Sequence, residues 1–249
     1  MAQASDDATV DELLRLAHGL GREDRRLALL GEGNVSAALG DGRLLVKASG
    51  SKLATLDAAG LTACAAAPLL GLLGRDVSDA ESLAALEAAR ADPDAGRPSV
   101  EASFHAHLLT LPNVGFVAHA HPEATLAILC SDAAEAFAAR PLFPDQVVVC
   151  GATMPLVGYV DPGPALATAI AEAVAEHADP KVILLRNHGV ITLGPTADAA
   201  LAAMLMCEKA ARVFAAAHSL GGARPMAEAD VARIDGREDE AYRRRALNL

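Results

Sequence analysis

Aromatic side chains are what this sequence lacks most: they make up 3% of its 249 residues, and there is no tryptophan. The apolar share of 52% comes mostly from Ala, Leu and Val, and Ala-rich stretches favour helices. Basic residues are also few, because 21 Lys and Arg stand against 32 Asp and Glu, a formal net charge of -11. Such an acidic surface repels phosphate backbones and anionic lipids, so we expect no nucleic acid and no membrane as partner. A phosphorylated small molecule stays open, since it needs only a local pocket of N–H donors and cations.

Cysteine is scarce and shows no pairing pattern. Cys64, Cys130, Cys150 and Cys207 lie in apolar surroundings, and no two of them form a C-x-x-C motif. We therefore expect buried, reduced thiols in a cytoplasmic protein. The segment Met1–Asp7 has neither the basic nor the apolar region of a signal peptide, and the Ala/Leu-rich stretches are interrupted before they reach membrane-spanning length.

No internal repeat, low-complexity linker or shift in composition divides the chain, so we expect one domain over residues 1–249. Strand-like and helical segments alternate, and several strands are joined by short turns. Asp41-Gly42, for example, is a hairpin signal between strands expected at 36–39 and 44–47. The sequence therefore predicts an α/β fold in which helices cover a mixed or antiparallel sheet.

The remaining elements are expected from hydrophobic periodicity and from end signals. Pro98 to Glu101 opens a helix with Ser99 as a plausible N-cap, and a polar tail begins at Gly221. One strand ends at a pair of histidines described below. Further helices are expected at 9–22, 78–90, 122–130, 164–177 and 196–218, and further strands at 146–150, 181–185 and 190–193.

Two histidines, His119 and His121, follow the apolar run 114–118 and stand two residues apart. In a strand, residues at this spacing point to the same face, so the two imidazoles can bind one metal ion with little rearrangement. A third histidine, His188, stands in the turn-like Asn187-His188-Gly189. Imidazole suits zinc and neighbouring transition metals, and three protein ligands with an open position are typical of catalytic zinc. The sequence therefore predicts a metalloenzyme.

Glu101 and His105 stand four residues apart in an expected helix and so share one face. A glutamate near a helix N-terminus is favoured by the helix dipole alone. The alternative is a carboxylate beside the metal that serves as general acid and base. The histidine triad favours this second interpretation.

Five motifs in order resemble the class II aldolase/adducin family over residues from about 10 to 220. The Gly-Glu-Gly-Asn and Val-Lys-Ala-Ser-Gly stretches are most similar to the aldolase part of RhaD-type aldolase/dehydrogenase proteins. The motifs are Gly33-Asn34-x-Ser36, Lys47-Ala48-Ser49-Gly50, Pro98-Ser99-Val100-Glu101 with His105, His119-x-His121-Pro122 and Asn187-His188-Gly189.

The resemblance implies a three-layer α/β/α domain with a central, largely antiparallel sheet, and a homotetramer with active sites between subunits. It implies that a zinc ion, or another divalent cation such as Mn²⁺, Co²⁺ or Fe²⁺, is bound by three histidines, and that Glu101 is the acid/base residue. The expected metal ligands are His119, His121 and His188. The expected cradle for a phosphate or carboxylate of the substrate is Asn34, Ser36, Ser49, Gly50 and Ser99.

Three positions depart from the aldolases of that family. Val100 stands where they carry a second serine, and Leu156 stands where they carry a catalytic tyrosine after a proline. Tyr159 is a candidate substitute for that tyrosine. Lys47 stands where they usually have a small hydroxyl residue, and is either a cation for an anionic substrate, which we favour, or an exposed strand lysine.

The expected function is a divalent-metal-dependent aldehyde-lyase that cleaves a small ketose phosphate or sugar acid by a retro-aldol reaction. That cleavage leaves an enediolate, which a dication held by neutral imidazoles can stabilise. An epimerase, a decarboxylase or a dehydratase of the same fold is the alternative, because each begins with an oxyanion beside the reacting carbon. A non-catalytic, adducin-like interaction protein is less favoured, since the three histidines and Glu101 are all retained.

Overall fold

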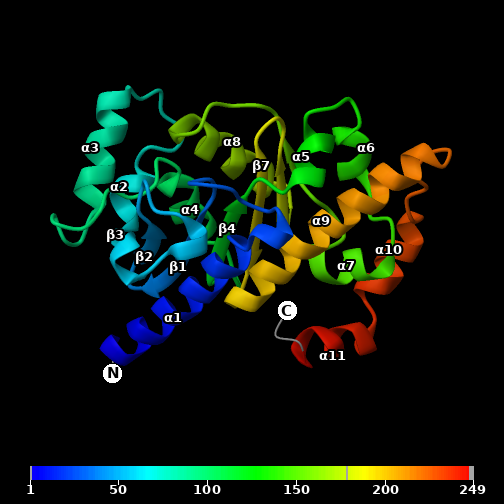
Figure 1. Ribbon diagram of the computed structural model, residues 1–249, viewed down its shortest axis with the longest axis horizontal. Helices are drawn as coiled ribbons and strands as arrows, with labels where there is room; N and C mark the ends of the chain where they lie inside the picture. The colour runs from blue at the N-terminus through cyan, green and yellow to red at the C-terminus, as the bar shows by residue number, and fades with distance from the viewer. Residues whose placement is uncertain (1, 178, 247–249) are drawn as a thin grey trace.

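The computed structural model describes residues 2–177 and 179–246 and is built around a seven-stranded sheet (Figure 1). The strand order is β3-β2-β1-β4-β7-β6-β5, and each neighbouring pair is antiparallel except β5 with β6. This confirms the largely antiparallel α/β fold. The strands are β1 (Asn34–Gly40), β2 (Arg43–Lys47), β3 (Leu61–Ala65), β4 (Phe116–Ala120), β5 (Leu156–Val157), β6 (Val182–Leu185) and β7 (Gly189–Gly194).

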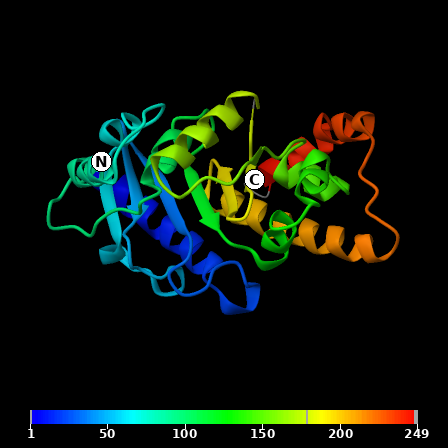
Figure 2. The ribbon, with the colours of Figure 1, turned by 90° about the horizontal axis from the view of Figure 1, so that it is seen from above.

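Helices cover both faces of this sheet and give three layers. In Figure 2 the sheet lies between α8 on one side and α1 with α9 on the other. The helices are α1 (Ala2–Leu20), α2 (Ala66–Leu70), α3 (Asp79–Ala89), α4 (Ala102–Leu108), α5 (Glu123–Leu129), α6 (Ala134–Ala139), α7 (Pro144–Cys150), α8 (Pro164–Ala175), α9 (Ala197–Ser219), α10 (Glu228–Asp235) and α11 (Glu238–Ala246), with short 3-10 turns at Glu23–Arg25, Leu53–Thr55 and Ala58–Gly60. No helix among these residues combines the length and the apolar character needed to cross a bilayer.

Alternate residues of the strands enter different apolar clusters. Ala118 and Val190 belong to the cluster that includes α1 and α9, whereas their neighbours Val117 and Ile191 pack with Phe104 of α4 and with α8. This is the two-residue period of a strand. Because both faces are covered, the central strands read as continuous apolar runs with little polar alternation.

The stretch 146–150, expected to be a strand, is instead helical and forms most of α7. Its β-branched residues suggested a strand, but Pro144 occupies the first turn and Asp145 follows it, both of which favour a helix start. Val147 and Val148 pack against α10 in a small separate cluster. Tertiary packing therefore overrides the local preference.

Ser99 is not the N-cap of α4. That helix begins at Ala102 with Glu101 in the cap position, and the Ser99 hydroxyl accepts from the Glu101 backbone N–H at 3.3 Å, two residues away. The stretch after Gly221, expected to be a polar tail, contains the helices α10 and α11, which sequence periodicity did not predict. The other expected helices and strands are present within a few residues at most ends, although α1 begins at Ala2.

All four cysteines are free thiols, as expected. Cys64, Cys150 and Cys207 are buried, but Cys130 is exposed, which contradicts the expectation for that residue. It stands at the end of α5, where the chain leaves the core, and it lines a surface cavity with His121.

Candidate metal centre

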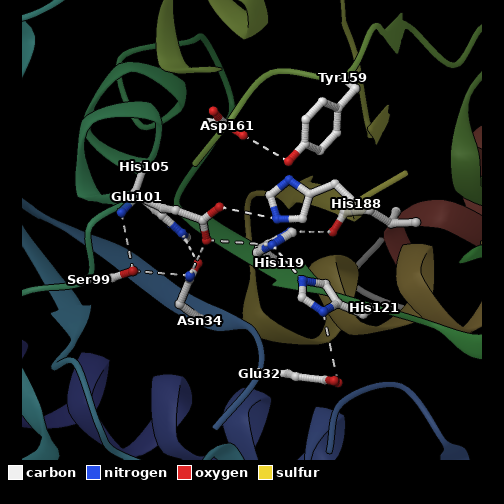
Figure 3. Close-up of polar contacts among 11 residues, drawn as sticks. Glu32, Asn34, Ser99, Glu101, His105, His119, His121, Tyr159, Asp161 and His188 are labelled. Carbon is white, nitrogen blue, oxygen red and sulfur yellow. Dashed lines mark hydrogen bonds and ion pairs between the residues drawn. The ribbon is translucent and has the colours of Figure 1, made fainter. Parts of the chain in front are cut away.

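The three expected ligands come from two neighbouring strands of the sheet. His119 is in β4, His121 follows the end of that strand, and His188 lies in the turn between β6 and β7. Strand β7 pairs with β4, so the turn lies at the same edge as the histidine pair. One nitrogen from each of the three rings lies within 4.8 Å of the others (Figure 3). This arrangement could hold one metal ion.

A hydrogen bond through Nδ1 fixes the orientation of the His119 ring. Its Nδ1–H donates to the backbone oxygen of Val190 at 3.0 Å, which leaves Nε2 as the acceptor nitrogen. That nitrogen lies 3.2 Å from Nε2 of His121. A ligating histidine is commonly held through its other ring nitrogen in this way, because the bond fixes both the tautomer and the ring plane.

Burial keeps the imidazoles neutral. Burial, together with a smaller effect of a neighbouring histidine, lowers the pKa of His119 to about 3 and that of His121 to about 4. Burial also lowers the pKa of His188, although the charge of Glu101 opposes this. Neutral imidazole is the form that binds a metal ion, so these rings fit the group that the sequence predicts.

Gly189 allows the rings to approach the backbone. A Cβ at this position would lie 2.7 Å from Cδ2 of His121 and 2.6 Å from the backbone oxygen of Ala120. The preceding Asn187 has a φ of 55°, a left-handed conformation that asparagine tolerates in tight turns. The Asn-His-Gly sequence is therefore explained by the turn and by the crowding around His121.

Glu101 completes the cluster. Its side chain is buried, with Oε2 at 3.5 Å from Nε2 of His119 and Oε1 at 3.4 Å from Nε2 of His188. Oε2 accepts from Nδ2 of Asn34 at 2.7 Å, whereas Oε1 has no hydrogen-bond partner among the described residues. A buried carboxylate oxygen without a donor needs an explanation, and a cation between it and the neutral histidines is a fitting one.

The expected anion cradle divides into two parts. Ser49 and Gly50 are exposed at the end of β2, and the Ser49 hydroxyl donates to the backbone oxygen of Pro98 at 3.2 Å. Gly50 has a φ of 87° and open space where a side chain would be. Ser99 is buried beside this loop and accepts from Nδ2 of Asn34 at 3.2 Å. The backbone N–H groups of Ser49 and Ser99 donate to the backbone oxygens of Arg97 and Lys47, at 2.8 and 3.2 Å.

Ser36 and Asn34 are turned inward. Ser36 is fully buried, and its hydroxyl lies 2.6 Å from Nδ1 of His105. The cause is the strand period, which points Ser36 beneath α4. The contact with substrate expected of this residue stays a prediction. Asn34 is also almost fully buried, with both ends of its amide bonded to protein groups.

Lys47 is buried, so it is not an exposed strand lysine. Burial lowers the pKa of its ammonium group, and the negative charge of Glu101 opposes that shift.

The other positions that depart from the aldolases lie in different places. Val100 is 51% exposed, and Leu156 lies in β5. Tyr159 is exposed and donates to Oδ1 of Asp161 at 2.8 Å (Figure 3).

Two residues near the cluster were not assigned a role from the sequence. His105 is fully buried and contacts both Ser36 and Asn34. Glu32 approaches Nδ1 of His121 to 3.9 Å. The spacing between Glu101 and His105 was a usable signal for the first. The Gly-Glu-Gly-Asn stretch that contains Glu32 was noted in the sequence, but only as part of the family resemblance.

Comparisons with known proteins find matches over most of this chain. The family model described as "Class II Aldolase and Adducin N-terminal domain" matches residues 12–215. An uncharacterized oxidoreductase of Bacillus subtilis, YuxG, is 31% identical over 198 residues, which cover 76% of this chain and 27% of that protein. The chain thus spans about a quarter of the length of that relative.

Two further relatives are similar over most of their length. A 3-oxo-tetronate 4-phosphate decarboxylase of Escherichia coli is 30% identical over 206 residues, which cover 82% of this chain and 84% of that protein. The crystal structure of Escherichia coli YgbL, proposed as an aldolase, epimerase or decarboxylase, has 27% identity and a TM-score of 0.69. That match covers 92% of this chain and 98% of YgbL.

Proposed function

This chain belongs to the class II aldolase and adducin family, and from that premise we propose that it is a metal-dependent carbon–carbon lyase. Its proposed substrate is a small ketose phosphate or sugar acid, cleaved by a retro-aldol reaction into a short ketone and an aldehyde. One observation carries the proposal: three neutral imidazole nitrogens converge beside a buried carboxylate that has one free oxygen.

His119, His121 and His188 would hold the divalent cation, zinc or a neighbour such as Mn²⁺, Co²⁺ or Fe²⁺. When bound, the cation supplies positive charge that stabilises an oxyanion on the substrate. Because the histidine ligands are neutral, they do not themselves cancel that charge.

Glu101 is the proposed acid/base residue. Its Oε1 is the oxygen left free to take a proton from the substrate and to return it to carbon, while Oε2 is held by Asn34. Ser49, Gly50 and Ser99 would bind the phosphate or carboxylate of the substrate, with Lys47 supplying a positive charge nearby.

We further propose that the chain acts as one domain over residues 1–249 in a cytoplasmic homotetramer with active sites between subunits. Leu29 and Leu30 are 53% and 83% exposed in the loop before β1, where a cavity of about 340 Å³ includes Leu29, Glu32 and His121. Exposed leucines beside a metal cluster favour cover by a second subunit. Light scattering tests this, with four times the chain mass of 25.5 kDa expected.

The first experiment is elemental analysis of the purified protein and of a His119→Ala/His121→Ala variant. We expect about one transition-metal ion per chain in the wild type and none in the variant. The matched control is His218→Ala, at the far end of α9, which should keep the metal. A wild-type protein that holds no metal and takes none up would contradict the proposal and favour a non-catalytic, adducin-like role.

Product analysis then separates the reactions. Ketose 1-phosphates and 3-oxo-tetronate 4-phosphate are incubated with the metal-loaded protein, and products are identified by NMR. An aldehyde with a ketone phosphate supports the retro-aldol reaction. Release of carbon dioxide instead supports the second candidate, a decarboxylase, which the Escherichia coli relative and the Leu156 substitution favour.

A further inference from the structure

Behind Glu101 lies a chain of buried hydrogen bonds that does not itself reach the histidine cluster. Ser36, on β1, bonds to Nδ1 of His105 at 2.6 Å, and Nε2 of His105 bonds to Oδ1 of Asn34. The other end of that amide, Nδ2, donates to Oε2 of Glu101 at 2.7 Å. Three elements, β1, α4 and the segment before α4, therefore meet at one side chain, that of Asn34 (Figure 3).

The chemistry of the groups allows only one arrangement of protons along this chain. Oε2 of Glu101 is an acceptor, so the amide atom facing it must be the nitrogen of Asn34. A reversed amide would put two acceptor oxygens 2.7 Å apart, in a buried site where that repulsion is strong. Oδ1 of Asn34 then needs a donor, and among the described residues only Nε2–H of His105 is placed to provide it. Nδ1 of His105 is consequently the acceptor for the Ser36 hydroxyl.

Packing holds the His105 ring in one orientation. It is fully buried, and its ring stacks on Phe104 with centroids 4.6 Å apart. Burial holds its pKa well below the usual value, which agrees with a neutral ring that donates on one side and accepts on the other. A ring packed this closely cannot exchange its two nitrogens without disturbing α4.

We propose that His105 is a positioning residue that fixes the amide of Asn34 and thereby selects Oε1 of Glu101 as the oxygen that exchanges protons with the substrate. The inference rests on the proposed function, since it deepens the role given to Glu101. Without the Nε2–H donor, the buried Oδ1 of Asn34 has no partner, so the amide is no longer held in place and its bond to Oε2, which distinguishes Oε2 from Oε1, is weakened. His105 contacts neither substrate nor metal in this role.

The tautomer is tested on the wild-type protein without any assay of activity. Long-range proton–nitrogen NMR spectra of the full chain, labelled with ¹⁵N-histidine, show which ring nitrogen carries the proton. We expect His105 to carry it on Nε2, with slow exchange against solvent, and we expect faster exchange in Asn34→Ala. A proton on Nδ1, or on both nitrogens at neutral pH, would overturn the inference.

The effect on catalysis is tested with His105→Phe, a planar ring of similar size without nitrogens. We expect kcat to fall by about a hundredfold, as for a misplaced catalytic group, with zinc content unchanged. His107→Phe, on the same helix and half-buried, is the matched control and should keep its kcat. Wild-type kcat in His105→Phe would overturn the inference.

A double variant separates positioning from a general loss of structure. If His105 acts through Asn34, then Asn34→Ala/His105→Phe is no slower than Asn34→Ala alone, because the path is already broken. If the two losses multiply, His105 acts independently and the inference fails. Should the wild type turn over none of the candidate substrates, the proposed function fails, while the NMR spectra still decide the arrangement of His105.

Discussion

The two faces of β1 differ in what they bury. Val35 and Ala37 point into the large apolar cluster under α1 and α9. Asn34 and Ser36, which alternate with them, point under α4 into the hydrogen-bonded chain that ends at Glu101. All four side chains are almost fully buried. Burial alone therefore does not tell a core position from a supporting position of the site, whereas the partners do.

Substitutions on the two faces of β1 are also expected to have different effects. On the apolar face, a substitution removes contacts and leaves a cavity, so it lowers the free energy of unfolding. On the polar face, a substitution leaves a buried donor or acceptor without its partner and reorients the next group in the chain. We therefore expect stability to be lost on the first face, and turnover on the second.

Removing the acid/base group has the largest expected effect. Glu101→Gln keeps the shape of the side chain and an oxygen for Asn34, but it cannot carry the proton. We expect kcat to fall by about a thousandfold, with the thermal midpoint little changed. The control is Glu123→Gln, an exposed residue that pairs with Arg26. A variant with wild-type turnover would contradict the role of Glu101.

On the apolar face, Val35→Ala should lower the free energy of unfolding by about 2 kcal/mol and leave kcat unchanged. Urea denaturation and steady-state kinetics measure the two quantities. Val213→Ala is the control, because Val213 is 41% exposed on α9 and loses little packing. If Val35→Ala lowers kcat as strongly as His105→Phe does, the proposed division between the faces of β1 is wrong.

The histidines His119 and His121 should make the stability of the metal-free protein depend on pH. In the metal-free protein, the pKa values of His119 and His121 are about 3 and about 4, below the ordinary value of 6.5. The unfolded chain therefore binds more protons between these values, so stability is fully present above 6.5 and falls as the pH drops towards 4.

Each of these histidines contributes a slope of up to about 1.4 kcal/mol per pH unit. Urea denaturation of the metal-free protein at several pH values measures the slope. His119→Gln removes one titrating ring and should make the dependence on pH shallower. An equal slope in this variant and in the wild type would show that other groups dominate.

A surface ion pair should matter least. Arg186, next to the metal-centre turn in sequence, donates from Nη2 to both oxygens of Glu135, at 2.7 and 2.9 Å. The glutamate is 65% exposed, so Arg186→Ala should lower the free energy of unfolding by at most about 1 kcal/mol. Glu208→Ala is the contrasting variant, since this buried carboxylate binds the backbone N–H groups of Ala124 and Thr125.

Glu208→Ala should destabilise by about 1–3 kcal/mol, because it leaves those donors at the start of α5 unsatisfied. Differential scanning calorimetry of both variants gives the comparison. A larger loss in Arg186→Ala than in Glu208→Ala would mean that exposure is a poor guide to the strength of charged contacts in this fold.

The sequence by itself indicated an α/β fold with helices over a mixed or antiparallel sheet, and it singled out the three histidines and Glu101, which lie together in the structure. These features depend on local signals: the two-residue and four-residue periods, turn residues such as Asp41-Gly42, and ligand types at fixed spacing. The same local signals misjudged 146–150, where β-branched residues lie in a helix because α9 and α10 surround it.

Only the tertiary structure decided which polar residues face one another. Asn34 and His105 are 71 positions apart, and their contact depends on the pairing of β1 with β4 and on the packing of α4 over both. A strand period predicts that Ser36 lies on one face, but it cannot predict whether that face is open to a ligand or covered by a helix. The face of β1 that carries Ser36 is covered by α4, so the serine hydroxyl bonds to His105.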